Sequence, residues 1–327
     1  MRKFLLSALC MLLACAVSTE KKARTILEQG LNDRSKAVRV AAALGLDEVE
    51  PERGARALLA MLEGSEPEIQ AACLEGLVTY STQEPRLDPE IVRLCASPSV
   101  PVRVAALRNA ALSADPEAKA LLLQAVNDES ARVRQVAYAG LAKFNEPDVL
   151  DQGFRDGDML VRVTVARALG LAGADGMVEA IIEELKNSAP DQLGPGVIML
   201  AELGDTTVRG QLRILAAEST GELRVDVAEA LLILEDRAGI DALEKAVQSN
   251  DPFVRIRAMD VLARYDVPDM REQIVEATRD EYVNVAVKAV QALAEHDASR
   301  YRKLFAELMD SSSPLLRITA AAAFLKD

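Results

Sequence analysis

Few side chains in this sequence could do catalytic or metal chemistry. His296 is the only histidine and follows Glu295, so a site with several histidine ligands cannot form. The chain has no glycine-rich phosphate loop before Lys-Ser or Lys-Thr, no Cys-x-x-Cys and no nucleophile elbow. We therefore expect no enzyme activity, no metal and no cofactor, and we expect His296 to lie in solvent at the end of its helix.

Adjacent carboxylates are the remaining candidates for acid–base chemistry. That work requires burial, which shifts the pKa of a carboxyl group. The pairs at residues 47–48, 183–184 and 235–236 fall on expected helix surfaces or loops. We therefore interpret them as solvated acids.

The start of the chain indicates export. Arg2 and Lys3 precede an apolar stretch, residues 4–13, that is too short to span a bilayer. The stretch leads into Leu12-Leu13-Ala14-Cys15, which resembles a bacterial lipobox.

The lipobox resemblance implies that residues 1–14 are a signal peptide, that Cys15 is lipidated, and that residues 15–19 are a short tether. It implies a lipid-anchored protein on the periplasmic side of a bacterial cell envelope. Ala16, which is not the Asp of inner-membrane retention, implies the outer membrane. Conventional cleavage near Ala14 and an uncleaved apolar start remain alternatives.

The net charge excludes partners that need a basic surface. The chain carries −13, and removing residues 1–14 takes away two basic residues and no acid, which leaves 36 basic against 51 acidic residues, or −15. Nucleic acids and anionic lipid surfaces bind basic patches. We therefore expect no nucleic-acid partner and membrane contact only through the N-terminal lipid.

Two further cysteines, Cys73 and Cys95, could form a disulfide in an oxidising envelope. Cys73 takes a place that other copies of the repeat described next give to alanine, which favours a small buried thiol. Both interpretations stay open.

A short pattern recurs ten times along the chain. It consists of an aliphatic or β-branched residue, then usually Arg, then usually Leu seven residues later. The spacing of 28–33 residues predicts a stacked solenoid. The Arg slot falls at Arg39, Gln70, Arg103, Arg134, Arg162, Leu193, Arg224, Arg255, Ala286 and Arg317.

Each copy reads as a helical hairpin. Around Arg134, apolar residues at helical spacing predict helices over 117–126 and 131–144, separated by the turn residues Asn127 and Asp128. The acidic turn, the Val-Arg pair and the small-residue helix ending in Leu resemble the HEAT repeat family. The 31-residue period is similar to the short HEAT-like repeats named after phycobilisome lyases.

The resemblance covers about residues 20–327. It implies an all-α fold, a right-handed α-solenoid (an armadillo/HEAT-like superhelix) of about ten hairpins. Deoxyhypusine hydroxylases of this family hold iron with repeated His-Glu pairs, which this chain lacks. The family also implies that the slot arginines pair with turn acids of their own or a neighbouring repeat, most clearly Arg134 with Asp128 and Arg162 with Asp156. The predicted structural ladder is Arg39, Arg103, Arg134, Arg162, Arg224, Arg255 and Arg317.

Two places depart from the regular repeat. Leu193 is followed by Gly194-Pro195-Gly196, which predicts that this second helix starts late, near Pro195; a hinge between repeats 1–5 and 6–10 is the alternative. At the C-terminus, either a polar outer face caps the last hairpin or this end packs on another chain. We favour the cap.

The second helices should line the inner, concave wall of the solenoid, with residues two, five and nine places after the slot on the free face. In repeat 1 these are Ala41, Leu44 and Glu48, and in repeat 9 they include Glu295. The wall should be apolar near the N-terminus and charged toward the C-terminus, although small residues could serve stacking alone and charges could pair with each other. The predicted partner-binding residues are Glu75, Arg108, Asp226, Glu229, Arg257, Asp260, Arg264, Lys288 and Gln291.

The sequence thus predicts a non-enzymatic scaffold or adaptor of the bacterial envelope that binds partner proteins along this concave face. One alternative is an enzyme or enzyme-accessory protein of the lyase-like HEAT family. Another is a structural envelope protein that associates with itself.

Overall fold

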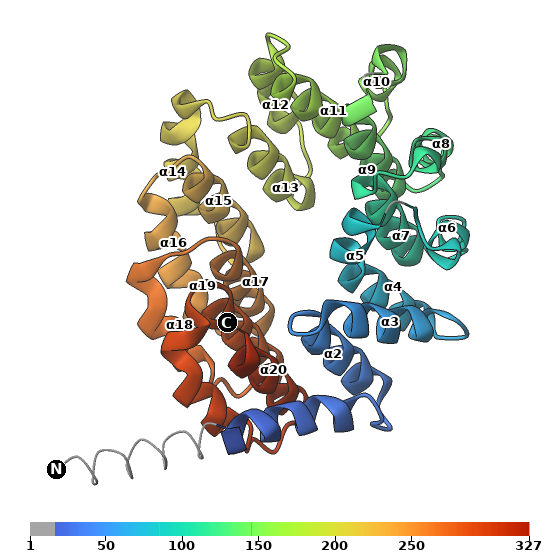
Figure 1. Cartoon of the computed structure of the whole chain (residues 1–327). Coiled ribbons are helices and arrows are strands. Elements are labelled where there is room, and N and C mark those ends of the chain that lie inside the picture. Colours follow the sequence, from blue (N-terminus) through green and yellow to red (C-terminus); the bar gives the residue numbers. More distant parts are fainter. Residues whose placement is uncertain (1–16, 85, 145, 327) are drawn as a thin grey trace, which may run out of the picture. The chain divides into compact units, whose positions relative to one another are not determined.

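The computed structural model describes residues 17–84, 86–144 and 146–326, and these contain helices and no β-strand (Figure 1). Cys15 and the predicted signal peptide lie outside the described residues. Residues 17–19 are helical, and the domain bounds that the sequence suggests at this end stay a prediction. The helices are 17–30, α2 (Lys36–Asp47), α3 (Pro51–Leu62), α4 (Pro67–Gly76), α5 (Val78–Gln83), α6 (Pro89–Leu94), α7 (Val100–Leu112), α8 (Pro116–Ala125), α9 (Ala131–Leu141), α10 (Pro147–Gly153), α11 (Met159–Leu171), α12 (Met177–Lys186), α13 (Pro190–Ala201), α14 (Arg209–Glu218), α15 (Gly221–Ile233), α16 (Ala238–Val247), α17 (Pro252–Arg264), α18 (Arg271–Ala277), α19 (Val283–Leu308) and α20 (Pro314–Leu325), with short 3-10 turns between some of them.

The repeat formed by α8 and α9 is a helical hairpin, as the sequence predicts. Asp115 caps α8 because its carboxylate accepts a hydrogen bond from the amide of Glu117 at 2.8 Å, which satisfies a donor that the helix leaves open. Apolar residues three and four places apart on the two helices form the core. Stacking of such hairpins makes the protein an all-α solenoid, which confirms the predicted fold class. The core of this hairpin includes Leu122, Val133, Ala137 and Leu141.

The helices belong to two compact units. Of the described residues, unit 1 contains those from 17–61 and 262–326, and unit 2 contains those from 62–261.

In unit 1 the first and last hairpins of the chain share one apolar core. Leu27 of helix 17–30 and Ala42 of α2 are buried together with Ile318 of α20, and α2 lies beside α20 (Figure 1). The approach is close, since a Cβ on Gly30 would lie 2.8 Å from the Ile318 side chain. The C-terminal hairpin is therefore covered by the first hairpin, which replaces the polar cap that we favoured from the sequence.

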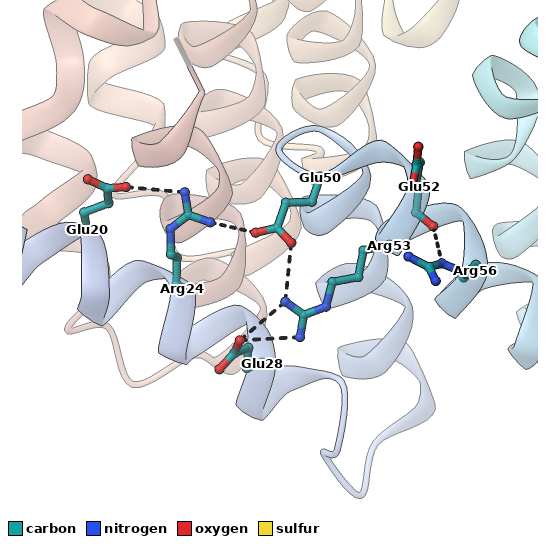
Figure 2. A network of polar contacts seen from close by, with 7 residues as sticks. All are labelled: Glu20, Arg24, Glu28, Glu50, Glu52, Arg53 and Arg56. Atoms are coloured by element: carbon teal, nitrogen blue, oxygen red, sulfur yellow. Dashed lines mark hydrogen bonds and ion pairs between the residues drawn. The ribbon is translucent and has the colours of Figure 1, made fainter.

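An ion-pair network joins helix 17–30 to the start of α3 in unit 1. Figure 2 shows Arg24 between Glu20 and Glu50, and Arg53 between Glu50 and Glu28. The N···O distances run from 2.6 to 3.4 Å. These side chains are about half exposed, so each pair contributes about 0–1 kcal/mol. The network orients the two helices, and apolar burial supplies most of the stability.

All seven predicted ladder arginines bind the turn that precedes their own helix. In unit 2, Nη1 of Arg134 donates to the backbone carbonyl of Asp128 at 2.9 Å. Within the repeat, the partner is this carbonyl and not the carboxylate that the sequence pairing suggested. A guanidinium-to-turn-carbonyl bond is likewise made by Arg39, Arg103, Arg162, Arg224, Arg255 and Arg317.

In unit 2, the slot arginines of three successive repeats also bind a carboxylate of the following repeat. Each makes two N–H···O bonds to one carboxylate, the geometry in which a guanidinium binds most strongly. Glu184, expected to be solvated, is one of these partners. The pairs are Arg103–Asp128, Arg134–Asp156 and Arg162–Glu184, with N···O distances of 2.5–2.8 Å.

The sixth repeat carries Leu193 in the slot and interrupts this series. Its second helix, α13, begins at Pro190 and continues through Pro195, so the predicted late start near Pro195 is wrong. A proline in the first turn presets the backbone without losing a helical hydrogen bond, which explains the start at Pro190.

No side chain fits at Gly194 or Gly196, because neighbouring side chains fill the space beside both residues. A Cβ on Gly194 would lie 2.1 Å from Oδ2 of Asp226, and one on Gly196 would lie 2.3 Å from Cδ2 of Leu185. Packing therefore accounts for both glycines. The hinge at this place stays a prediction.

Cys73 and Cys95 are both free thiols, so the structure has no disulfide between them. Cys73 is fully buried and Cys95 half-buried. Burial raises the pKa of Cys73 to about 11 and that of Cys95 to about 12. Both groups are therefore poor nucleophiles at neutral pH.

We expect Ile318→Ala to loosen helix 17–30, which is remote in sequence. The change removes a buried side chain from the shared core and should cost about 2–4 kcal/mol, so amide hydrogen exchange in residues 17–30 should accelerate. Ile214→Ala is the matched control, since Ile214 is 61% exposed on α14. Unchanged protection of helix 17–30 in the Ile318 variant would contradict the shared core.

We expect Arg134→Leu to lower the free energy of unfolding by about 2 kcal/mol at pH 7, because Arg134 and Asp156 are 18% and 8% exposed. The Arg134 guanidinium holds the pKa of Asp156 below 3.8. The bridge therefore stabilises fully above pH 3.8 and is lost as the pH falls through the lowered value.

Urea unfolding of both proteins between pH 7 and pH 2 measures this difference. It should shrink below pH 3.8. Arg155→Leu, which removes a pair whose arginine is 77% exposed, is the control and should change little at any pH. A difference that stays the same at pH 2 would show that Arg134 acts through the turn carbonyl of Asp128 and through packing, and not through the carboxylate of Asp156.

Candidate functional site

Two of the predicted partner-binding residues, Asp226 and Glu229, are paired with an arginine of the next repeat. In unit 2, Asp226 and Glu229 of α15 are buried, with 9% and 1% of their surface exposed. Arg257 of α17 donates to Asp226 at 2.7 Å and to Glu229 at 3.2 Å. The interpretation of Asp226 and Glu229 as open partner-binding residues is therefore wrong. The arginine of the next repeat lies over both acids and removes them from solvent.

The other predicted residues of unit 2 are more open. Arg108 of α7 and Glu75 of α4 pair at 2.6 Å, and each side chain is about half exposed. Asp260 of α17 is half-buried. These charges interact with neighbours in the chain and are not gathered around a cavity.

A groove of about 750 Å³ lies in unit 1, on the inner faces of α2, α19 and α20 and the end of α17. Its floor is made of small and apolar residues, and its rim is charged. Two of the predicted partner-binding residues, Arg264 and Gln291, line it; Lys288, half-buried on α19, does not. The lining also includes Ala41, Leu44, Glu48, Ala294, Glu295, His296, Thr319, Ala322, Ala323 and Lys326.

One wall of the groove has two carboxylates and one cation. Nζ of Lys326 lies 2.5 Å from Oε2 of Glu295 and 3.9 Å from Oε2 of Glu48. Partial removal from water raises the pKa of Glu48 above 4.5; Lys326 opposes the rise, and the carboxylates of Glu295 and Asp47 add to it. This wall is therefore acidic apart from the ammonium group of Lys326.

His296 lies at the end of the groove beside a kink in α19 at Asp297, where the backbone leaves helical geometry. Its Nε2 donates to the carbonyl of Leu262 at 2.9 Å, near the end of α17. The expected exposed histidine is instead half-buried and satisfies a carbonyl that the helix end leaves open. Its place is structural.

The inner-face rule located part of this groove but did not predict that its parts meet. Ala41, Leu44 and Glu48 of repeat 1 lie opposite Gln291 and Glu295 of repeat 9, because the terminal hairpins pack on each other. Lys326 and Thr319 were missed. The same rule applied to the tenth slot would have named both, since they lie nine and two places after Arg317.

Among the described residues, no three or more His, Cys, Asp and Glu side chains are arranged to hold a metal ion. None of the helices in this part of the chain combines the length and the apolar character needed to cross a bilayer.

Comparison with known proteins indicates the type of helical repeat in part of the chain. Residues 88–152, from the start of α6 to near the end of α10, match the family model of HEAT repeats. The match supports a HEAT-repeat protein. Within this segment, Arg103 binds the carboxylate of Asp128 in the following repeat. No curated protein matches the chain significantly in sequence.

Three solved structures illustrate what the chain is similar to. Human deoxyhypusine hydroxylase in complex with glycerol shares 15% identity, over 78% of this chain and 96% of that one, with a TM-score of 0.33. An engineered protein shares 16%, over 94% and 99%, with a TM-score of 0.32. YibA of Escherichia coli shares 17%, over 77% and 96%, with a TM-score of 0.35.

We expect Arg257→Met to lower the free energy of unfolding by about 3 kcal/mol, because it takes the guanidinium away from two buried carboxylates. Adding Glu229→Gln to this variant should restore part of the loss, since one buried charge is then removed. Urea unfolding measures both effects. Arg108→Met is the control and should cost at most about 1 kcal/mol. If the Arg257 and Arg108 variants lost equally little free energy of unfolding, the result would contradict a buried ion pair between Arg257 and the two acids.

Proposed function

We propose that the protein is a non-enzymatic scaffold or adaptor that binds a segment of a partner protein in the groove of unit 1. The groove is the observation that supports this most directly, because it combines an apolar floor with a charged rim. An apolar floor gives area for burial, and a charged rim gives selectivity. Small residues such as Ala41 and Ala322 leave room there for the side chains of a partner.

We also propose that the protein works at the periplasmic side of a bacterial envelope as a lipoprotein. Cys15 precedes the first described residue, Val17, by two positions. Helix 17–30 packs in the same core as α2 and α20, which line the groove. A lipid on Cys15 would then hold the groove close to the membrane surface.

No comparable observation supports the two alternatives, which are an enzyme or enzyme-accessory protein and a structural envelope protein that associates with itself. Self-association through the last hairpin would need an open apolar face, but Ile318 and its neighbours on α20 are already covered by the first hairpin. The titratable side chains that line the groove are Glu48, Arg264, Glu295, His296 and Lys326, and the two carboxylates are 42% and 57% exposed.

Site-specific photo-cross-linking in intact cells tests the proposal. A cross-linking amino acid at Gln291, which is exposed in the groove, should give an adduct of defined mass with one envelope protein. The same amino acid at Lys303, exposed outside the groove, is the matched control and should give none.

A groove-filling variant separates this site from other surfaces. Thr319→Trp should reduce the adduct at residue 291 about tenfold, whereas Thr25→Trp, on the exposed face of helix 17–30, should leave it unchanged. Circular dichroism should show equal helix content for both variants. Adducts of equal yield at residues 291 and 303, or none at 291, would contradict the proposal.

A further inference from the structure

We propose that the partner segment presents a lysine or arginine side chain to the groove, and that this side chain displaces Lys326 from Glu48 and Glu295. The inference rests on the proposed function and names the chemistry of the partner. In this view Lys326 is an internal stand-in for the partner's cation.

The three charges of this wall leave one excess negative charge. Two carboxylates, Glu48 and Glu295, face a single ammonium group, at 3.9 and 2.5 Å from their Oε2 atoms. An approaching carboxylate would be repelled by both, and an approaching cation would be attracted. The wall therefore selects for a basic group.

Lys326 is placed so that it can leave. Helix α20 ends at Leu325, and Lys326 has extended backbone geometry at φ −67° and ψ 133°. Its side chain can therefore move without breaking the helix. It is 27% exposed, while Glu48 and Glu295 are 42% and 57% exposed, so a competing group can reach both acids from solvent.

The floor of the groove suits the stem of such a side chain. Ala41, Leu44 and Ala323 lie beside the acidic wall in the same cavity. Lysine and arginine bury their methylene stems on apolar surface while the charged end meets an acid. A basic residue flanked by small apolar residues would thus satisfy floor and wall together.

The other polar groups that line the groove do not offer an equivalent site for an acidic segment. His296 already donates its Nε2–H to Leu262, and Arg264 has interactions of its own within the chain. A basic segment is therefore the occupant that the groove favours.

The test uses two fluorescein-labelled helical peptides rich in alanine and leucine, one with a central arginine and one with the neutral isostere citrulline. Fluorescence anisotropy is measured with the full-length chain. The arginine peptide should bind about tenfold more tightly than the citrulline peptide. Lys326→Met, which removes the internal cation and keeps an apolar stem, should tighten the arginine peptide several-fold and leave the citrulline peptide unchanged. Glu295→Gln should weaken the arginine peptide about tenfold.

Lys303→Met, outside the groove, is the control and should change neither affinity. Hydrogen exchange of helix 17–30 checks that the Lys326 and Glu295 variants keep the core of unit 1. Equal binding of both peptides, blocked by Thr319→Trp, would leave the groove as a partner site and overturn the inference. Binding of neither peptide, or tighter binding of the citrulline peptide, would also overturn it, and the cross-linking from Gln291 would still decide the proposed function.

Discussion

A hairpin in a stacked helical array can bury its apolar faces only against neighbouring hairpins, so the two ends of the array must find cover. In this chain they cover each other. Leu27 and Ala42 from the first hairpin share a core with Ile318 from the last. This contact decides more than stability, because it brings the inner faces of α2 and α20 together. The groove of unit 1 exists only where these faces meet.

The slot arginine solves a different problem, which is local to each repeat. A turn between two packed helices leaves carbonyl groups without a helical partner, and a buried carbonyl must be satisfied. The guanidinium satisfies the turn carbonyl with one nitrogen and, in three repeats, binds the next repeat's carboxylate with the others. Where Leu193 replaces it, α13 lies against Asp226 of the next repeat, and Arg257 binds that acid from the repeat beyond. Side-chain pairing between repeats thus continues past the sixth repeat with different residues.

The sequence predicts the features that the repeats share. It does not predict contacts that particular side chains make with another repeat. The hairpins and the slot arginines follow from the period, and the structure contains them. The start of α13 was wrong because Pro195 was interpreted as a helix breaker, although Pro190 supplies a better start. Asp226 and Glu229 were wrongly placed in solvent because the rule for the free face considers one helix at a time. It therefore leaves out Arg257 of the next repeat, which binds both acids. The groove could not be predicted, because it joins residue 44 to residue 291 through a contact between the ends of the chain.

The two clusters of inner-face charge differ in what they can exchange. Arg257 binds Asp226 and Glu229 in a largely dry place, where removal of the cation costs several kcal/mol. Lys326 binds Glu295 and Glu48 at the edge of solvent, where such a pair contributes about 0–1 kcal/mol. A partner's cation can therefore replace Lys326 at small cost, whereas it cannot replace Arg257. A charge pair on the inner face of a hairpin can be exchanged only where the neighbouring repeat leaves water beside it, and the pairs of Lys326 with Glu295 and Glu48 meet this condition.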